Sequence, residues 1–313
     1  MRAKSLALTL PVLLLVAVVA AVGTGGVAQA APTDRPVPTD GCRAPAARVV
    51  DQASTVDVDG RARRYTWTAS DRSGPKPLVL DLHGLLEGLF LVHPTMSQFS
   101  PKALEEGFVV AYPVGELEGV LWDLSETGPS LRYIDALLAK VEAETCIDRN
   151  RIYVTGLSYG AFMSSAIMCY RSDVFAAAAP VAGLLNPCGE TARKIPLVTF
   201  HGTGDPILWY PFFKDAPQAW ATKYGCGPAT RTTVTDADPA TGHPIFRDRW
   251  DCRGQRTDVE SYVIEGGGHA WPGSWFSTLI GVIVGPTPTS IDATDIIWDF
   301  FERHPLRTSG RSR

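Results

Sequence analysis

A short segment near the middle of the chain could present a serine hydroxyl for nucleophilic attack. Residues 156–160 read Gly-Leu-Ser-Tyr-Gly and fit the pattern G-x-S-x-G, whose glycines leave room for a sharp turn that exposes the serine. The same five residues could also form an ordinary glycine turn. Residues 152–155 are typical of a strand and residues 161–170 are compatible with a helix. Because this context is a strand followed by a helix, we predict that Ser158 is a nucleophile.

A serine hydroxyl needs a base that removes its proton as it attacks, and histidine is the usual one. His269 stands in a glycine-rich segment, 265–273, after the last predicted strand. The flanking glycines would let a loop carry the imidazole over the edge of a sheet. We interpret the other histidines as structural or surface residues, with His83 as an exception; they are His83, His93, His201, His243 and His304.

A triad also needs an acid that holds the imidazole in one tautomer and stabilises the imidazolium. On scaffolds that carry the G-x-S-x-G turn, the chain order is serine, acid, histidine. Asp205 lies in this interval, one tight turn after the apolar run 196–200. The alternative for Asp205 is a solvated turn residue. The other aspartates weighed in the interval follow no strong strand; they are Asp215, Asp236 and Asp238.

Negative charge that develops on a carbonyl oxygen needs backbone N–H donors aimed at it. The amide of Tyr159, directly after the serine, is one candidate. The second should come from the loop after the strand that ends in Leu-His-Gly, residues 82–84. We predict the amide of Leu85, because His83 and Gly84 match the start of the oxyanion loop of lipases and esterases. An ordinary strand-end turn is the alternative.

The elements that would hold these residues alternate between strands and helices. Short apolar runs indicate buried strands, and apolar residues at helical spacing indicate amphipathic helices. The predicted strands are 63–68 (an antiparallel edge strand), 77–82, 108–112, 151–155, 176–181, 196–200 and 259–264, and the predicted helices are 131–144, 162–170, 218–224 and 292–301. This alternation is typical of a mostly parallel sheet covered on both faces. We predict a single α/β domain of the doubly wound class.

The first thirty residues indicate the compartment. Arg2 and Lys4 precede the apolar run 6–22, and 28–30 reads Ala-Gln-Ala, which together are typical of a secretory signal peptide. An uncleaved membrane anchor is the alternative. We expect a secreted, extracellular protein without a stable membrane anchor. It would have a signal peptide at 1–30, a flexible leader at 31–45, a catalytic domain at 46–308 and a disordered tail at 309–313.

The net charge and the cysteines limit the partners and cofactors that we expect. The formal net charge is −4, which gives no reason to expect nucleic acid or an anionic membrane as partner; we expect a monomer. The cysteines are Cys42, Cys146, Cys169, Cys188, Cys226 and Cys252. An even number in an oxidising compartment predicts disulfides. Cys226 with Cys252 is the best single pair because they flank one polar, turn-rich excursion. The spacing lacks the tight pairs of a zinc site, so we expect no metal and no cofactor.

Five segments together resemble one family of enzymes. They are Leu-His-Gly at 82–84, Gly-Leu-Ser-Tyr-Gly at 156–160, His-Gly-Thr-Gly-Asp at 201–205, Gly-Gly-Gly-His-Ala-Trp-Pro-Gly at 266–273, and 291–294 with 297–301. In these the chain resembles the polyhydroxybutyrate depolymerase-like esterases, which are related to secreted feruloyl and acetylxylan esterases. The resemblance implies the α/β-hydrolase fold, an acyl-enzyme, and Ser158, Asp205 and His269 as the triad. It also implies a late disulfide at Cys226 and Cys252.

The chain departs from this family in three places. Ala161 stands where a second glycine usually follows the turn, and 128–134 lacks the paired aspartates often seen there. Residues 274–285 are unusually apolar. They could pack against the domain, or Trp275 and Phe276 could belong to a lid or a contact surface for an apolar substrate. His83 and Trp271 are further candidates for lining the substrate pocket, and Trp271 could equally be core.

These observations predict a secreted serine esterase that hydrolyses carboxylic esters. Its substrate would be an ester, possibly polymeric, of the polyhydroxyalkanoate or the feruloyl or acetyl polysaccharide type. A secreted acyltransferase with the same triad is an alternative, in which another alcohol replaces water. A non-catalytic protein that binds a polymer or a cell wall would have no need for the three residues in this chain order.

Overall fold

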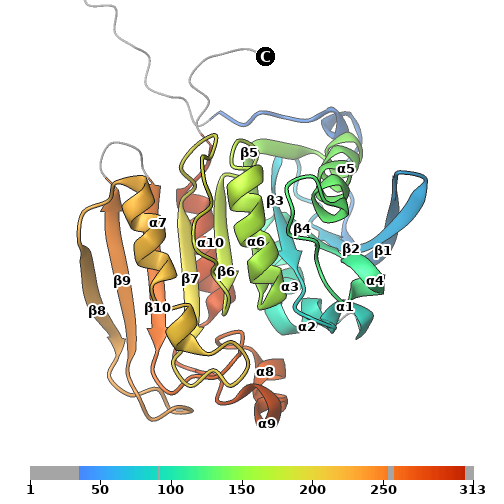
Figure 1. The fold of residues 1–313 in the computed structure, drawn as a ribbon. Coiled ribbons are helices and arrows are strands. Elements are labelled where there is room, and N and C mark those ends of the chain that lie inside the picture. Colours follow the sequence, from blue (N-terminus) through green and yellow to red (C-terminus); the bar gives the residue numbers. More distant parts are fainter. Residues whose placement is uncertain (1–34, 91, 253–256, 307–313) are drawn as a thin grey trace, which may run out of the picture.

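The computed structural model describes residues 35–306, except 91 and 253–256. In this range the chain forms a ten-stranded sheet (Figure 1). In spatial order its strands are β1 (Val49–Val58), β2 (Arg61–Ala69), β4 (Val109–Pro113), β3 (Lys76–Leu82), β5 (Ile147–Leu157), β6 (Ala177–Val181), β7 (Leu197–Gly202), β10 (Thr257–Ile264), β9 (Ile245–Cys252) and β8 (Ala229–Thr235). The central strands from β4 to β10 pair in parallel, and the outer strands pair antiparallel. The predicted mostly parallel sheet is confirmed.

Helices cover both faces of this sheet (Figure 1). One face carries α5 (Pro129–Glu144), α6 (Tyr159–Tyr170) and α7 (Ala216–Tyr224), and the other carries α3 (Phe99–Glu106) and α10 (Ala293–Arg303). The short helices are α1 (Glu87–Phe90), α2 (His93–Ser97), α4 (Glu116–Gly119), α8 (Trp275–Leu279), α9 (Gly281–Val284), η1 (Asp40–Arg43) and η2 (Tyr210–Phe212). Because helices lie on both faces, the fold is doubly wound, as the sequence predicts.

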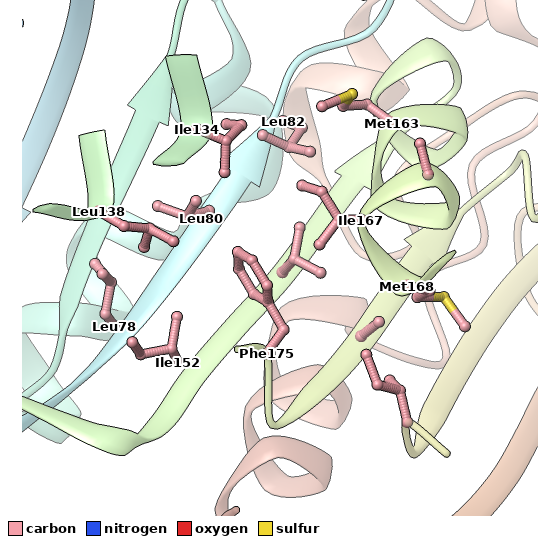
Figure 2. Packing of buried hydrophobic residues seen from close by; sticks show 14 of the residues in the cluster. Leu78, Leu80, Leu82, Ile134, Leu138, Ile152, Met163, Ile167, Met168 and Phe175 are labelled. Atoms are coloured by element: carbon pink, nitrogen blue, oxygen red, sulfur yellow. The ribbon is translucent and has the colours of Figure 1, made fainter. Parts of the chain in front are cut away.

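The alternation of side chains along β3 explains why the sheet is buried on both faces. Leu78 and Leu80 pack toward α5 and α6, whereas Val79 packs toward α3 and α10. Figure 2 shows the first of these layers, in which Ile134 and Ile167 approach the leucines of β3. Full burial of one such side chain contributes about 1.5–3 kcal/mol. Packing in these two layers therefore holds in place the strands whose carboxyl ends carry the candidate site.

The predicted elements agree with the structure except at the two sides of the sheet. Residues 63–68 lie in β2, which has β1 outside it and is therefore not an edge strand. The strands β1, β8 and β9 were not predicted. β8 is almost wholly exposed and rich in threonine, so it has no apolar pattern, and most of β1 is exposed as well. Asp292 caps α10 as expected, accepting from the N–H groups of Thr294 and Asp295.

Three disulfides are present: Cys226–Cys252, Cys42–Cys146 and Cys169–Cys188. The first is the predicted pair, and it joins the end of α7 to the end of β9. Cys42 lies in the segment expected to be a flexible leader, and its disulfide joins that segment to Cys146, directly before β5. There, Val37 N–H donates to the Asp148 carboxylate at 2.8 Å and Thr39 N–H to Ile147 O at 3.1 Å. The described part of that segment, 35–45, is therefore attached to β5.

Two predicted segments lie outside the described residues: the signal peptide at 1–30 and the disordered tail at 309–313. Within the described part of the chain, no helix combines the length and the apolar character needed to cross a bilayer.

The sequence separations of the disulfides predict unequal effects on stability. Cys42–Cys146 closes a loop of 104 residues and Cys169–Cys188 one of 19. Loop-closure entropy in the unfolded chain predicts that removing the first pair costs about 1.5 kcal/mol more than removing the second. Denaturant unfolding of the two double Cys→Ser variants measures this difference. Equal losses, or a larger loss for Cys169–Cys188, would contradict it.

Candidate active site

Ser158 occupies a sharp turn between β5 and α6. Its backbone has φ 59° and ψ −117°, a conformation that costs energy for a residue with a side chain. The Ser158 N–H donates to Val181 O at 2.9 Å, which ties the turn to the end of β6. A β-carbon at Gly160 would lie 1.9 Å from Leu82 O. The second glycine of the pattern is therefore required because the turn presses against the end of β3.

Asp205 and His269 meet at the same edge of the sheet. His269 Nδ1 donates to Asp205 Oδ2 at 2.7 Å, and both side chains are buried. The other carboxylate oxygen accepts from the N–H groups of Ile207 and Leu208, each at 2.8 Å. Because Nδ1 carries the donated proton, Nε2 of the neutral imidazole is the nitrogen that can accept one. The pair thus has the geometry of a base and the residue that orients it.

The charge on Asp205 is stabilised by its hydrogen bonds. Burial raises the pKa of this carboxyl, but donors from His201, His269 and Ile207 outweigh burial and hold the pKa well below its usual range. Two loops must approach closely to form this arrangement. Gly204 N–H donates to Gly267 O at 2.9 Å, and a β-carbon at Gly202 would lie 2.2 Å from the same oxygen.

Parallel pairing brings Ser158 to the edge that carries this pair. Ser158 follows β5, Asp205 follows β7 and His269 follows β10. Across the sheet Leu157 pairs with Val181, and Val181 with Phe200, so these strands end at similar heights (Figure 1). Within the described part of the chain the Ser158 hydroxyl makes no hydrogen bond; the structure joins His269 to Asp205 directly and places Ser158 at the same sheet edge.

His201 is a site residue, although the sequence was interpreted as giving it a structural or surface role. Its Nε2 donates to Leu208 O at 2.9 Å and lies 3.4 Å from Asp205 Oδ2, and its ring stacks on Phe213. Asp205 Oδ2 therefore faces two imidazoles. The signal was present in the spacing, because His201 lies near the end of β7, four residues before Asp205, and a tight turn brings the two together.

The two amides predicted to bind the oxyanion lie on adjacent segments. Tyr159 begins α6, so its N–H has no acceptor within that helix. The amide of Leu85 makes no hydrogen bond within the described residues, although Gly84 N–H donates to Glu87 Oε2 at 2.7 Å and Leu86 N–H to Val120 O at 2.9 Å. Because Gly160 packs on Leu82 and His83, the loop that follows β3 starts beside the turn of Ser158.

Two predicted substrate-lining residues lie in the interior instead. His83 Nε2 accepts from Gly115 N–H at 2.9 Å, and its Nδ1 donates to Gly84 O at 2.8 Å. Burial lowers the pKa of His83 to about 4, against the opposing effect of its bond to Gly84. Trp271 is 1% exposed, and its Nε1 donates to Thr294 Oγ1 at 3.0 Å. Both side chains are satisfied by protein partners, so neither has the exposure that lining a pocket requires.

The apolar segment 274–285 combines the two predicted alternatives. Phe276 and Ile280 pack against the core, whereas Trp275 and Leu279 are 55% and 70% exposed. Val284 O accepts from the N–H of His269 at 2.6 Å, so the segment is attached to the histidine loop. Figure 1 shows α8 and α9 at the same sheet edge as α1 and α2.

Other exposed apolar side chains stand on the loops that follow β3 and β7. Together with 274–285 they form what we call the apolar rim: Leu85, Leu86, Leu89, Ile207, Trp209, Phe212, Trp275, Leu279, Val282 and Ile283. Because the three loops start at the carboxyl ends of parallel strands, the rim lies at the sheet edge that holds Ser158, Asp205 and His269. Exposed apolar surface of this kind often marks a binding site.

Several known proteins are similar to this chain. The model of the prolyl oligopeptidase family matches residues 133–209, from α5 to the loop after Asp205. Feruloyl esterase D of Neurospora crassa is 26% identical over 74% of this chain and 82% of that protein. The putative esterase NocK of Nocardia uniformis is 26% identical over 82% and 84%. A bifunctional acetylxylan esterase/xylanase of Neocallimastix patriciarum is 24% identical over 79% of this chain, which spans only 34% of that protein.

The acetyl xylan esterase of Aspergillus awamori superposes with a TM-score of 0.58 at 14% identity, covering 80% of this chain and 99% of that one. This likeness and the sheet order confirm the α/β-hydrolase fold. The relatives are named esterases, so the predicted resemblance to feruloyl and acetylxylan esterases and the class of carboxylic-ester hydrolase are confirmed. The more specific resemblance to polyhydroxybutyrate depolymerases stays a prediction.

The buried neutral state of His83 predicts a pH-dependent loss of stability. The folded pKa of about 4 lies below the ordinary value of 6.5, so between these values the unfolded state binds more protons. Stability contributed by the neutral ring is present above about pH 6.5 and is lost as pH falls toward 4, by about 2.5 kcal/mol at pH 4.5.

The test is the free energy of unfolding of wild type and His83→Gln between pH 7 and 4.5. We expect the variant to be less stable at pH 7 and to lose less stability on acidification. Parallel pH profiles for the two proteins would show that His83 is not the titrating group.

Proposed function

We propose that the protein is a secreted serine esterase that hydrolyses carboxylic esters through an acyl-enzyme. The observation that carries the proposal is the 2.7 Å hydrogen bond between His269 and the buried Asp205, at the sheet edge where the strained turn presents Ser158. Three disulfides in the described chain support secretion. We propose a monomer that acts without metal or cofactor.

In the first half of the reaction, Ser158 Oγ attacks the ester carbonyl carbon as His269 Nε2 takes its proton. The negative carbonyl oxygen receives hydrogen bonds from the amides of Leu85 and Tyr159. His269 then gives the proton to the leaving alcohol, and an acyl-Ser158 ester remains. Asp205 stabilises the imidazolium while it exists and remains ionised, because its own hydrogen bonds hold its pKa low.

In the second half, His269 removes a proton from water, which attacks the acyl carbon. The same two amides receive the oxyanion, and the bond from the acyl carbon to Ser158 Oγ breaks. Proton return from His269 to Ser158 restores the enzyme and releases the acid. An alcohol could replace water in this step and give acyl transfer, which was the alternative from the sequence.

The apolar rim supports a substrate with an apolar acyl group or an apolar polymer chain. Aromatic side chains on two of its loops, Trp209 and Trp275 among them, are exposed beside the site. They suit an aromatic feruloyl group or an aliphatic polyester such as a polyhydroxyalkanoate. The names of the relatives favour feruloyl or acetyl esters of polysaccharide. We propose esters of these types as substrates.

Turnover of model esters tests the proposal. Purified protein should hydrolyse p-nitrophenyl acetate, butyrate or palmitate, and Ser158→Ala should lower kcat at least about 10³-fold because the nucleophile is gone. A fluorophosphonate probe should label wild type and not the variant. A folded wild type that is inert on all three esters and unlabelled would overturn the proposal.

Polar substitution in the rim should change the preference for acyl length. In Trp275→Ser/Leu279→Ser the ratio of kcat/KM for palmitate to that for acetate should fall about tenfold, because a long acyl chain loses apolar contact. The matched control is Val50→Ser/Val234→Ser, which removes exposed apolar side chains from β1 and β8, at the two sides of the sheet. Equal losses of kcat/KM on both esters would show that the rim does not bind the acyl chain.

A further inference from the structure

Three titratable side chains that the mechanism does not use lie behind the loop after β3. They form what we call the buried charge cluster, which consists of Asp81, Glu87 and His93. His93 Nε2 lies 2.7 Å from Asp81 Oδ1, and its Nδ1 lies 2.9 Å from Glu87 Oε2. Asp81 is fully buried, and the side chain of His93 is 3% exposed. Because each ring nitrogen has a carboxylate partner, both nitrogens are donors and the imidazole is positively charged.

The groups around His93 stabilise the positive charge on its imidazole. Burial lowers the pKa of His93, but the two carboxylates outweigh burial and raise it to about 10. The bond to His93 in turn holds the pKa of Glu87 below its usual range, against the opposing effect of burial. At neutral pH the cluster is therefore a cation between two anions.

Such a cluster is a poor device for stability alone. Replacing a buried ion pair by apolar residues of similar volume is often neutral or stabilising. Asp81 also has a buried oxygen, Oδ2, with no hydrogen-bond partner within the described residues, and leaving a buried oxygen of this kind unpaired is destabilising. Asp81 lies in β3, whose other side chains are chiefly apolar. The cluster therefore suggests a role in the site.

The cluster reaches the loop through Glu87. Its Oε2 accepts from Gly84 N–H at 2.7 Å as well as from His93, and a β-carbon at Gly84 would lie 2.8 Å from Oε1. The peptide group that follows, between Gly84 and Leu85, is held through its carbonyl oxygen. The Gly84 carbonyl accepts from His83 Nδ1 at 2.8 Å and from Glu87 N–H at 3.3 Å.

This second set of bonds sets the direction of the Leu85 amide. In a trans peptide the carbonyl and the N–H point in opposite directions, and the structure contains no cis peptide among its described residues. Since the carbonyl of Gly84 is directed at His83, the N–H of Leu85 is directed away from it. That N–H makes no hydrogen bond within the described chain and is free to receive a ligand.

We propose that Glu87, His93 and Asp81 are positioning residues that hold the Leu85 amide in the orientation needed to bind the oxyanion. The inference rests on the proposed esterase function and adds to it a support for one of the two donors. Asp81 fixes His93, His93 fixes the carboxylate of Glu87, and Glu87 fixes Gly84. None of the three touches the substrate.

The first test is Glu87→Ala, assayed on p-nitrophenyl butyrate. Loss of one oxyanion donor typically costs 10²–10³-fold in kcat. A misaligned donor should cost part of this, so we expect kcat to fall about 10- to 100-fold while KM stays within about threefold. Glu87→Gln can still accept from Gly84 N–H, so it should recover most of kcat. A kcat for folded Glu87→Ala within about twofold of wild type would overturn the proposal.

The second test asks whether Glu87 acts through Leu85. Leu85→Pro removes the N–H itself, and Leu85→Ala is its control because it keeps the amide. If Glu87 acts through that amide, Leu85→Pro/Glu87→Ala should be no slower than Leu85→Pro, because the two changes remove the same interaction. Multiplying losses would overturn the proposal. If Glu87→Ala fails to fold, His93→Ala replaces it in this cycle, because it removes the partner that fixes the Glu87 carboxylate, and losses that multiply with that of Leu85→Pro have the same meaning.

The two hypotheses fail in different ways. Wild-type turnover that depends on Ser158 establishes the esterase, and the cluster is judged only against that activity. An inert wild type overturns the proposed function and the positioning role with it. Full activity in Glu87→Ala, with Ser158→Ala inactive, overturns the positioning role alone.

Discussion

The site depends on backbone segments that approach one another more closely than a β-carbon would allow. At Gly160 the turn of Ser158 presses against the end of β3, and at Gly202 the loop of Asp205 presses against the loop of His269. Alanine at either position would force these segments apart. The two contacts place the turn of Ser158 beside the loop after β3 and Asp205 beside the loop of His269, so the proposed chemistry depends on two positions without side chains.

Electrostatics then decide what each buried group can do. His83 and His93 lie on consecutive segments and are both buried, yet burial lowers the pKa of the first and carboxylate partners raise that of the second. The partners of His83 are backbone groups, which a neutral ring satisfies with one donor and one acceptor. Asp205 is kept ionised in a similar way to Glu87, by donors that outweigh burial.

The parts of the fold that were predicted are those with strong local patterns. The helix predicted at 131–144 lies within α5, and the strand at 259–264 lies within β10. The strand β8 was missed because a solvated, threonine-rich edge has no apolar period. His83 and Trp271 were expected to line a pocket because they flank motif residues. Tertiary packing turned both inward, where backbone groups and Thr294 satisfy their polar atoms.

The sequence by itself indicated the turn at Ser158 and the proposed order of serine, acid and histidine, and it made Cys226 with Cys252 the best single candidate for a disulfide. The turn follows from the neighbouring residues in the chain. The order of the three residues is the one typical of scaffolds with the G-x-S-x-G turn, and the disulfide pair follows from the polar excursion that the two cysteines flank. Tertiary structure alone decided that four further cysteines pair as they do, and that Asp81, His93 and Glu87 meet beneath the loop after β3. Such contacts depend on how strand ends and loops are brought together in space, and residue spacing carries no record of the direction in which a loop side chain points.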